Sequence, residues 1–131
     1  MRSGTNRAAA AVLISLALIG PAKAGIDDYE FRLLERKVKM GAPSVVAVRL
    51  VDKRTGSPVS DAVIFARRID MAPDGMGSMT AALAPRPSSE PGVYRFETDL
   101  TMAGGWQLSL AAKVQGEIGT VLDKLILRAV R

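Results

Sequence analysis

Four methionines in two short stretches are the residues whose type and spacing could do chemistry. Met71, Met76 and Met79 fall within residues 70–79, and Met102 follows further along the chain. Thioether sulfur is a neutral, soft ligand that favours Cu(I), and it needs no deprotonation, so binding can persist at acidic pH. Glycine and proline between the first three methionines allow a loop that aims several sulfurs at one ion. The spacing predicts a Cu(I) or Ag(I) site at Met71, Met76 and Met79, with Met102 as a further ligand.

Methionine also has a purely structural use, and that alternative stays open here. It fills protein cores and contacts aromatic rings. Met102 precedes Trp106 by four residues, so it suits closing the end of a domain as well as binding metal. Met40 ends an expected strand and is assigned to packing. Trp106 is expected to be the central core aromatic, with a cation–π contact to a bound ion as the alternative. Asp70 and Asp74 are expected to cap turns.

The residue types that most enzymes and common metal centres need are missing. The chain has no histidine and no cysteine, so the usual ligands of zinc, haem iron and blue copper are absent, as are Ser–His and Cys–His nucleophile systems. Carboxylates are dispersed, with Asp27 and Asp28 as the adjacent pair. No glycine-rich stretch is followed by Lys-Ser or Lys-Thr, as a phosphate-binding loop requires. The sequence therefore predicts a protein that is not an enzyme.

The first 24 residues have the features of an export signal. Arg2 and Arg7 give a positive start, residues 8–19 are an uncharged run of twelve, and residues 22–24 (Ala-Lys-Ala) form a cleavage site. Twelve apolar residues are too few to span a bilayer, which takes about 20. We expect residues 1–24 to be a signal peptide, with an uncleaved anchor as the alternative. Residues 25–131 are then one exported, soluble domain in the periplasm or otherwise outside the cytoplasm.

The net charge depends on that cleavage. Removing residues 1–24 takes three of the 18 basic residues and none of the 13 acidic ones, so the net charge falls from +5 to +2. The remaining basic residues are scattered along the chain, whereas a nucleic-acid footprint needs a clustered basic face. Nucleic acid is not expected as a partner.

The segments before and after the methionines have the sequence pattern of short β-strands. Apolar and polar residues alternate over several segments, and glycine- and proline-containing turns separate them. The expected strands cover residues 29–34, 44–52, 62–70, 80–84, 93–99, 106–114 and 120–130. Residues 30–40 and 120–130 also contain helix formers, but short loops and neighbouring strand signals favour strands. The pattern predicts an all-β, immunoglobulin-like antiparallel sandwich of about seven strands, with residues 70–79 as a loop at one end.

Four motifs carry a resemblance to a known family. They are Asp-Ala-Val-Ile-Phe-Ala at 61–66, Asp-Met-Ala-Pro-Asp-Gly-Met at 70–76, Glu-Pro-Gly-Val-Tyr-Arg-Phe at 90–96 and Asp-Leu-Thr-Met-Ala-Gly-Gly-Trp at 99–106. With these the chain resembles the YtkA-like family, whose members are often labelled FixH family proteins. The resemblance implies an exported immunoglobulin-like domain found beside heavy-metal efflux systems of the resistance–nodulation–division type. Gly105 and the Gly77-Ser78 spacer depart from the family pattern, which more often has a larger residue and further methionines there.

Together these observations favour an exported, non-enzymatic accessory protein that binds or transfers Cu(I) or Ag(I) beside a heavy-metal efflux system. The alternative function is a metal-free module that docks an envelope protein through an exposed sheet edge or the methionine- and proline-containing segment.

Overall fold

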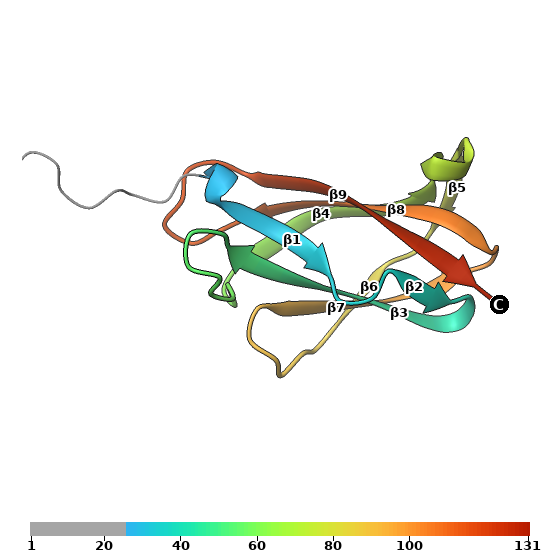
Figure 1. Ribbon diagram of the computed structural model, residues 1–131, viewed down its shortest axis with the longest axis horizontal. Helices are drawn as coiled ribbons and strands as arrows, with labels where there is room; N and C mark the ends of the chain where they lie inside the picture. The colour runs from blue at the N-terminus through green and yellow to red at the C-terminus, as the bar shows by residue number, and fades with distance from the viewer. Residues whose placement is uncertain (1–25) are drawn as a thin grey trace, which may run out of the picture.

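The computed structural model describes residues 26–131, which form two β-sheets packed face to face (Figure 1). The predicted signal peptide lies outside these residues. The strands are β1 (Tyr29–Leu33), β2 (Lys37–Lys39), β3 (Gly41–Asp52), β4 (Val63–Met71), β5 (Met76–Ala81), β6 (Ala84–Arg86), β7 (Val93–Leu100), β8 (Gly104–Lys113) and β9 (Val121–Val130). Two 3-10 turns, η1 (Ile26–Asp28) and η2 (Ala72–Asp74), complete the described chain. None of its helical segments is long and apolar enough to cross a bilayer.

The predicted sandwich is confirmed, but the described chain has nine strands where about seven were expected, and one strand pair is parallel. One sheet has the order β1-β3-β7-β6 and the other β2-β9-β8-β4-β5. Strand pairing is antiparallel except between β2 and β9, which run parallel. β2 exists because the charged segment after β1 crosses to the second sheet, where Val38 is buried between two exposed lysines. The sequence pattern could not separate this three-residue strand from β1.

Alternation along the strands builds the core between the sheets. On β8 the side chains of Trp106 and Leu108 are fully buried, and they belong to the same cluster as Val48 and Leu50 of β3. Trp106 is the largest fully buried side chain, and its indole N–H donates to the Met102 carbonyl at 3.0 Å. A buried indole needs such an acceptor. The prediction that Trp106 is the central core aromatic is confirmed.

The prediction of a loop over residues 70–79 is wrong in part. β4 continues to Met71, η2 turns the chain, and Gly75 adopts a left-handed conformation (φ 77°) that starts the return. β5 then pairs with β4, with Thr80 opposite Asp70. The Met-Gly-Ser-Met-Thr-Ala sequence of β5 lacks alternation, but an edge strand needs only backbone hydrogen bonds to one neighbour. Two of the candidate methionines therefore lie on a strand and not in a loop.

Candidate functional site: the methionine-bearing end of the sandwich

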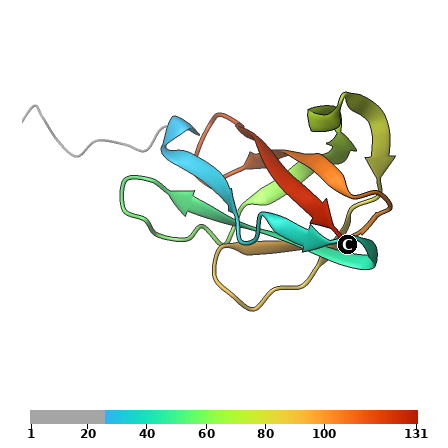
Figure 2. The same cartoon turned by 45° about the vertical axis from the view of Figure 1, so that its right-hand side comes forward.

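All methionines of the described chain lie at one end of the sandwich. Figures 1 and 2 show η2, β5 and the C-terminus together at the end away from η1. Gly104, which starts β8, pairs with Ala129 near the end of β9. The N–H of Met40 donates to the Val130 carbonyl at 2.8 Å, which brings the β2–β3 turn to the same end. The fold thus gathers Met40, Met71, Met76, Met79 and Met102 around a single end.

The three methionines of the first stretch are neighbours across the β4–β5 pair. Met71 lies directly opposite Met76 in the register, and Asp70 lies opposite Thr80, the residue after Met79. Directly opposed residues of antiparallel strands have Cα atoms about 4.5–5.5 Å apart. The register shifts between Asp70 and Met71, so the hairpin places the backbones of Met71, Met76 and Met79 near one another, while the metal site itself stays a prediction.

Met102 reaches the same place from a different connection. The Met71 Cε atom lies 3.0 Å from the position that a Cβ on Gly104 would occupy. Met102 is two residues before Gly104, and two residues of chain span at most about 7 Å. The two methionine stretches, which are far apart in the sequence, therefore meet where β4 ends and β8 begins.

Access to solvent divides the four candidate ligands into two pairs. Met76 and Met102 are 37% and 38% exposed, whereas Met71 is 0% exposed and belongs to the core. Met79 is half-buried and packs against that core. Solvent therefore reaches Met76 and Met102, whereas Met71 is enclosed by the core.

The carboxylates of this region hold the turn in place. Asp70 is buried and accepts hydrogen bonds from Arg68 Nε at 2.8 Å and from the Ala72 N–H at 2.9 Å. The Arg68 bond, with the Ala72 N–H as the next cause, holds the pKa of Asp70 below its ordinary value. Asp74 accepts from the Gly105 N–H at 3.1 Å and so ties η2 to β8. The expected turn-capping role is confirmed for Asp70, whereas Asp74 bridges two elements.

Two glycines make room for this turn. Gly104 has φ 138°, and a Cβ there would collide with the Asp74 carboxylate and press on Met71 Cε. A Cβ on Gly105 would lie 3.0 Å from Pro73 Cβ. The family pattern more often has a larger residue at the position of Gly105, but here Pro73 and Asp74 fill that space. The paired motifs at 70–76 and 99–106 are thus explained by one packing contact between η2 and β8.

Thioethers are the donors that this end of the sandwich offers. In the described part of the chain no group of three or more histidine, cysteine, aspartate or glutamate side chains is placed to hold a metal ion. The Trp106 ring is fully buried, so it does not face the solvent beside Met76 and Met102. Its hydrogen bond to the Met102 carbonyl instead fixes the connection that carries the Met102 side chain.

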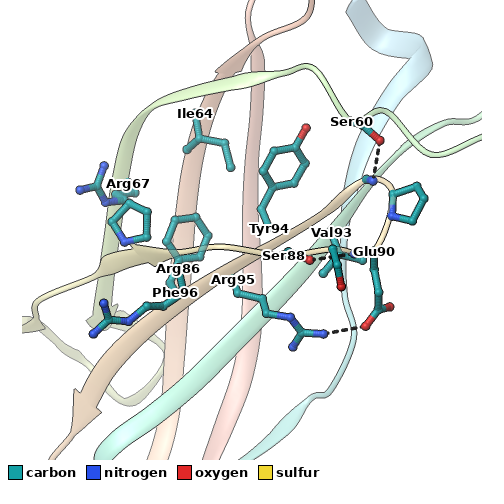
Figure 3. Close-up of a pocket in the computed structure, with 14 residues that line it drawn as sticks. Ser60, Ile64, Arg67, Arg86, Ser88, Glu90, Val93, Tyr94, Arg95 and Phe96 are labelled. Atoms are coloured by element: carbon teal, nitrogen blue, oxygen red, sulfur yellow. Dashed lines mark hydrogen bonds and ion pairs between the residues drawn. The ribbon is translucent and has the colours of Figure 1, made fainter.

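A groove between the two sheets is a second candidate site (Figure 3). It was not predicted from the sequence. It has a volume of about 510 Å³ and lies between β4 on one side and β6, β7 and their connection on the other. Three arginines line it together with apolar and hydroxyl side chains, namely Arg67, Arg86, Arg95, Ile64, Tyr94, Phe96, Ser60, Ser88 and Ser89. Its cations come singly from three different strands, so no sequence motif marks the groove.

Several side chains of the groove make hydrogen bonds within the protein. Arg95 donates to Glu90 at 2.8 Å, as Figure 3 shows, and Arg67 Nε donates to the Leu83 carbonyl at 3.1 Å. The Tyr94 hydroxyl donates to the Val59 carbonyl at 2.7 Å and accepts from the Ala62 N–H at 3.1 Å. Burial raises the pKa of Tyr94 above its ordinary value. Tyr94 therefore joins β7 to the segment that leads into β4.

The fold and this site define an immunoglobulin-like β-sandwich with a methionine-bearing end. The family model described as YtkA-like matches residues 23–111, and the chain belongs to the YtkA-like family. No curated protein matches the chain. Among solved structures it is similar to the crystal structure of the Lin-41 filamin domain, with 19% sequence identity and a TM-score of 0.44. That likeness covers 85% of this chain and 100% of the filamin domain.

Proposed function

We propose that this chain is an exported, non-enzymatic accessory domain that binds or transfers Cu(I) or Ag(I) beside a heavy-metal efflux system of the cell envelope. The observation that carries the proposal is the gathering of four candidate thioethers at one end of the sandwich, two of them exposed. Membership of the YtkA-like family supports an accessory domain. Soft, neutral sulfur donors select a monovalent soft ion over hard divalent cations.

In this proposal Met76 and Met102 are the entry ligands, and Met79 is the next donor. Met102 is held on a connection fixed by the Trp106 indole, and Met76 begins the edge strand β5. Met71 lies beneath them in the core, where its thioether becomes available when β5 moves away. A site with only a few neutral ligands at an exposed position holds the ion weakly. It therefore favours exchange of the ion with a partner over permanent storage.

The test is a Cu(I) titration of residues 25–131 under reducing conditions, in competition with a chromogenic chelator. The double variant Met76→Leu with Met102→Leu is expected to bind Cu(I) at least about tenfold more weakly, because both entry ligands are gone. Leucine conserves the volume of methionine, so the fold should tolerate the change. Met40→Leu, at the same end but packed against the core, is the matched control and should bind as the parent does.

Unchanged Cu(I) and Ag(I) affinity in the double variant would overturn the ligand assignment. Met79→Leu should weaken binding by less than the double variant does. Met71→Leu, at a fully buried position, should leave the affinity for the ion nearly unchanged and cost less than about 1.5 kcal/mol of stability.

A metal-free interaction module is the second candidate function, and the groove of Figure 3 favours it. The groove, of about 510 Å³, offers apolar and arginine side chains to a segment of a partner protein. A pull-down from envelope extract that retains the same partner with and without chelator would support this function over metal transfer. Arg67→Gln in the groove should then weaken retention, whereas Arg32→Gln on the outer side of β1 should not.

A further inference from the structure

One face of the molecule concentrates positive charge that is scattered in the sequence. In the second sheet Lys37 of β2 lies opposite Arg128 of β9, and Lys124 of β9 lies opposite Ser109 of β8, which in turn is opposite Arg68 of β4. Directly opposed residues share a face of a sheet, and so do every second residues of a strand. The outward positions of this sheet, which we name the cationic face, therefore carry Lys37, Lys39, Arg68, Lys113, Lys124 and Arg128, all exposed.

Carboxylates do little to neutralise the cationic face. The strands of this sheet contain two acidic residues, Asp70 and Asp123. Asp70 is buried against the Arg68 guanidinium at 2.8 Å, and Asp123 points to β1, where it accepts from the Phe31 N–H at 2.9 Å. In the described chain no ion pair joins a carboxylate to any of the four lysines or to Arg128. The Lys113 ammonium donates to the Ile118 and Gly119 carbonyls at 3.3 and 3.4 Å, so the charge directed at solvent is that of Lys37, Lys39, Lys124 and Arg128.

The opposite sheet shows a different arrangement of charge. There Arg32 pairs with Glu30 at 2.7 Å, and Arg95 pairs with Glu90 at 2.8 Å. Arg86 of β6 also donates to a carboxylate, that of Glu97 on the neighbouring β7, at 2.6 Å. The molecule is therefore electrostatically polarised, with a balanced face on one sheet and a positive face on the other.

Large apolar side chains project from the same positive face. Leu122 and Ile126, which are 72% and 52% exposed, alternate with Lys124 along β9. Val63 lies opposite Lys113 at the far side of the sheet, and Phe65 is exposed beside it at a bulge. A shallow apolar depression of about 470 Å³ lies between these strands. Exposed aliphatic groups interleaved with lysines on a flat surface suit a partner that offers both negative charge and hydrocarbon.

We infer that the cationic face is a membrane-binding surface for anionic phospholipids. Phosphate groups of the lipid would pair with the lysines, while the Leu122 and Ile126 side chains enter the interfacial hydrocarbon. A second copy of the chain does not fit, because self-association through this face would bring like charges together. The inference does not depend on the methionines and stands or falls separately from metal binding.

The test measures binding of residues 25–131 to vesicles of phosphatidylcholine with and without phosphatidylglycerol. This part of the chain contains every strand and the whole described core, and it lacks the apolar run of residues 8–19, which would bind bilayers itself. We expect binding only to the phosphatidylglycerol vesicles, and weakening of that binding as the salt concentration rises. Binding that does not depend on the anionic lipid would overturn the inference.

Matched variants locate the surface. Lys39→Gln with Lys124→Gln should weaken binding about 25-fold, because each cation near an anionic surface contributes about fivefold. Arg49→Gln with Arg86→Gln makes the same change in net charge on the opposite sheet, at β3 and β6, and should weaken binding less than about threefold. Equal losses in the two double variants would show a general charge effect and would overturn the inference.

An acidic protein is the rival partner, and the apolar residues distinguish it from lipid. Leu122→Ser with Ile126→Ser should weaken vesicle binding at least about tenfold, because burial of the two side chains is lost. It should leave binding to polyglutamate unchanged. If the double variant binds vesicles as tightly as the parent, hydrocarbon has no part in the contact, and an acidic macromolecule replaces lipid as the partner.

Discussion

Gly104 lies where β8, the η2 turn and the buried Met71 thioether meet, so its missing side chain has a direct structural consequence. We predict that Gly104→Ala lowers the free energy of unfolding by about 2 kcal/mol. The new Cβ would displace the Asp74 carboxylate from its hydrogen bond to the Gly105 N–H, and φ 138° strains an alanine backbone. Urea unfolding followed by tryptophan fluorescence measures the change.

Gly75→Ala is the matched control for that substitution. Gly75 also has a positive φ, of 77°, but nothing lies within 4 Å of the position of its Cβ. The control isolates backbone strain of about 1 kcal/mol from the collision with Asp74. Equal destabilisation by the two variants would contradict a close contact between Gly104 and the turn.

Tyr29 gives a prediction on alkaline stability. Its hydroxyl donates to Glu117 at 2.8 Å, and this bond, with burial as the next cause, raises the pKa of Tyr29 from 10.0 to about 12. The folded protein then holds this proton more tightly than the unfolded chain does. The stabilisation is fully present below pH 10 and is lost as the pH rises from 10 towards 12.

Urea midpoints at pH 9 and pH 11 test this linkage. The fall in midpoint between the two pH values should be smaller in Tyr29→Phe than in the parent, because the variant has no proton to lose at this position. Glu117→Gln, which keeps the hydroxyl but removes the carboxylate charge, should also reduce the fall. The same fall in all three proteins would refute the assignment.

For single residues, the sequence predicted which side chains could bind metal, but not how exposed each one is. The spacing of Met71, Met76, Met79 and Met102 predicted a shared metal site; the β4–β5 register and the Met71–Gly104 contact bring them to one end, and the metal site stays a prediction. Their exposure could not be predicted, because it depends on which side of β4 faces the core. Met71 lies two residues after the buried Ile69 and so faces the core as Ile69 does. This was not predicted, because residues 70–79 were interpreted as a loop.

Alternation of apolar and polar residues predicted most of the strands. It failed for strands that do not bury one face. β3, β7, β8 and β9 have a buried face, and their alternation was sufficient to place them. β5 and β6 are edge strands with little burial, so pairing with a single neighbour defines them, and glycine or proline interrupts their pattern. This is why the hairpin carrying Met76 and Met79 was interpreted as a loop.

The link between the two sheets at Tyr94 gives an element-scale prediction. We expect Tyr94→Phe to lower the free energy of unfolding by about 1–2 kcal/mol, because the hydroxyl loses hydrogen bonds to the Val59 carbonyl and the Ala62 N–H. Hydrogen exchange should show faster exchange of the Ala62 amide in the variant. Amides of β8, in the centre of the other sheet, report the global loss of stability, and the Ala62 amide should speed up more than they do. An unchanged Ala62 exchange rate would contradict the bond.

At the scale of the whole molecule, the sandwich could be predicted but the distribution of charge over it could not. The lysines and arginines of the cationic face are spread from position 37 to position 128, and no local segment is strongly basic. Only the order β2-β9-β8-β4-β5 brings them to one surface. A net charge near neutrality for residues 25–131 therefore conceals a polarised molecule, which matters for any partner met at a surface.

The sandwich should fold without the residues that precede it. Every buried residue of the core cluster lies within residues 31–129, so removal of residues 1–25 should leave the fold intact. We expect residues 26–131 to unfold in one cooperative urea transition, with a slope of about 1 kcal/mol per molar and the midpoint of the full chain. Tryptophan fluorescence reports the buried Trp106 environment, and far-ultraviolet circular dichroism reports the sheets. If the two signals change at different urea concentrations, or if the shortened chain binds a hydrophobic dye, then residues 1–25 contribute to folding and the sandwich is not an independent unit.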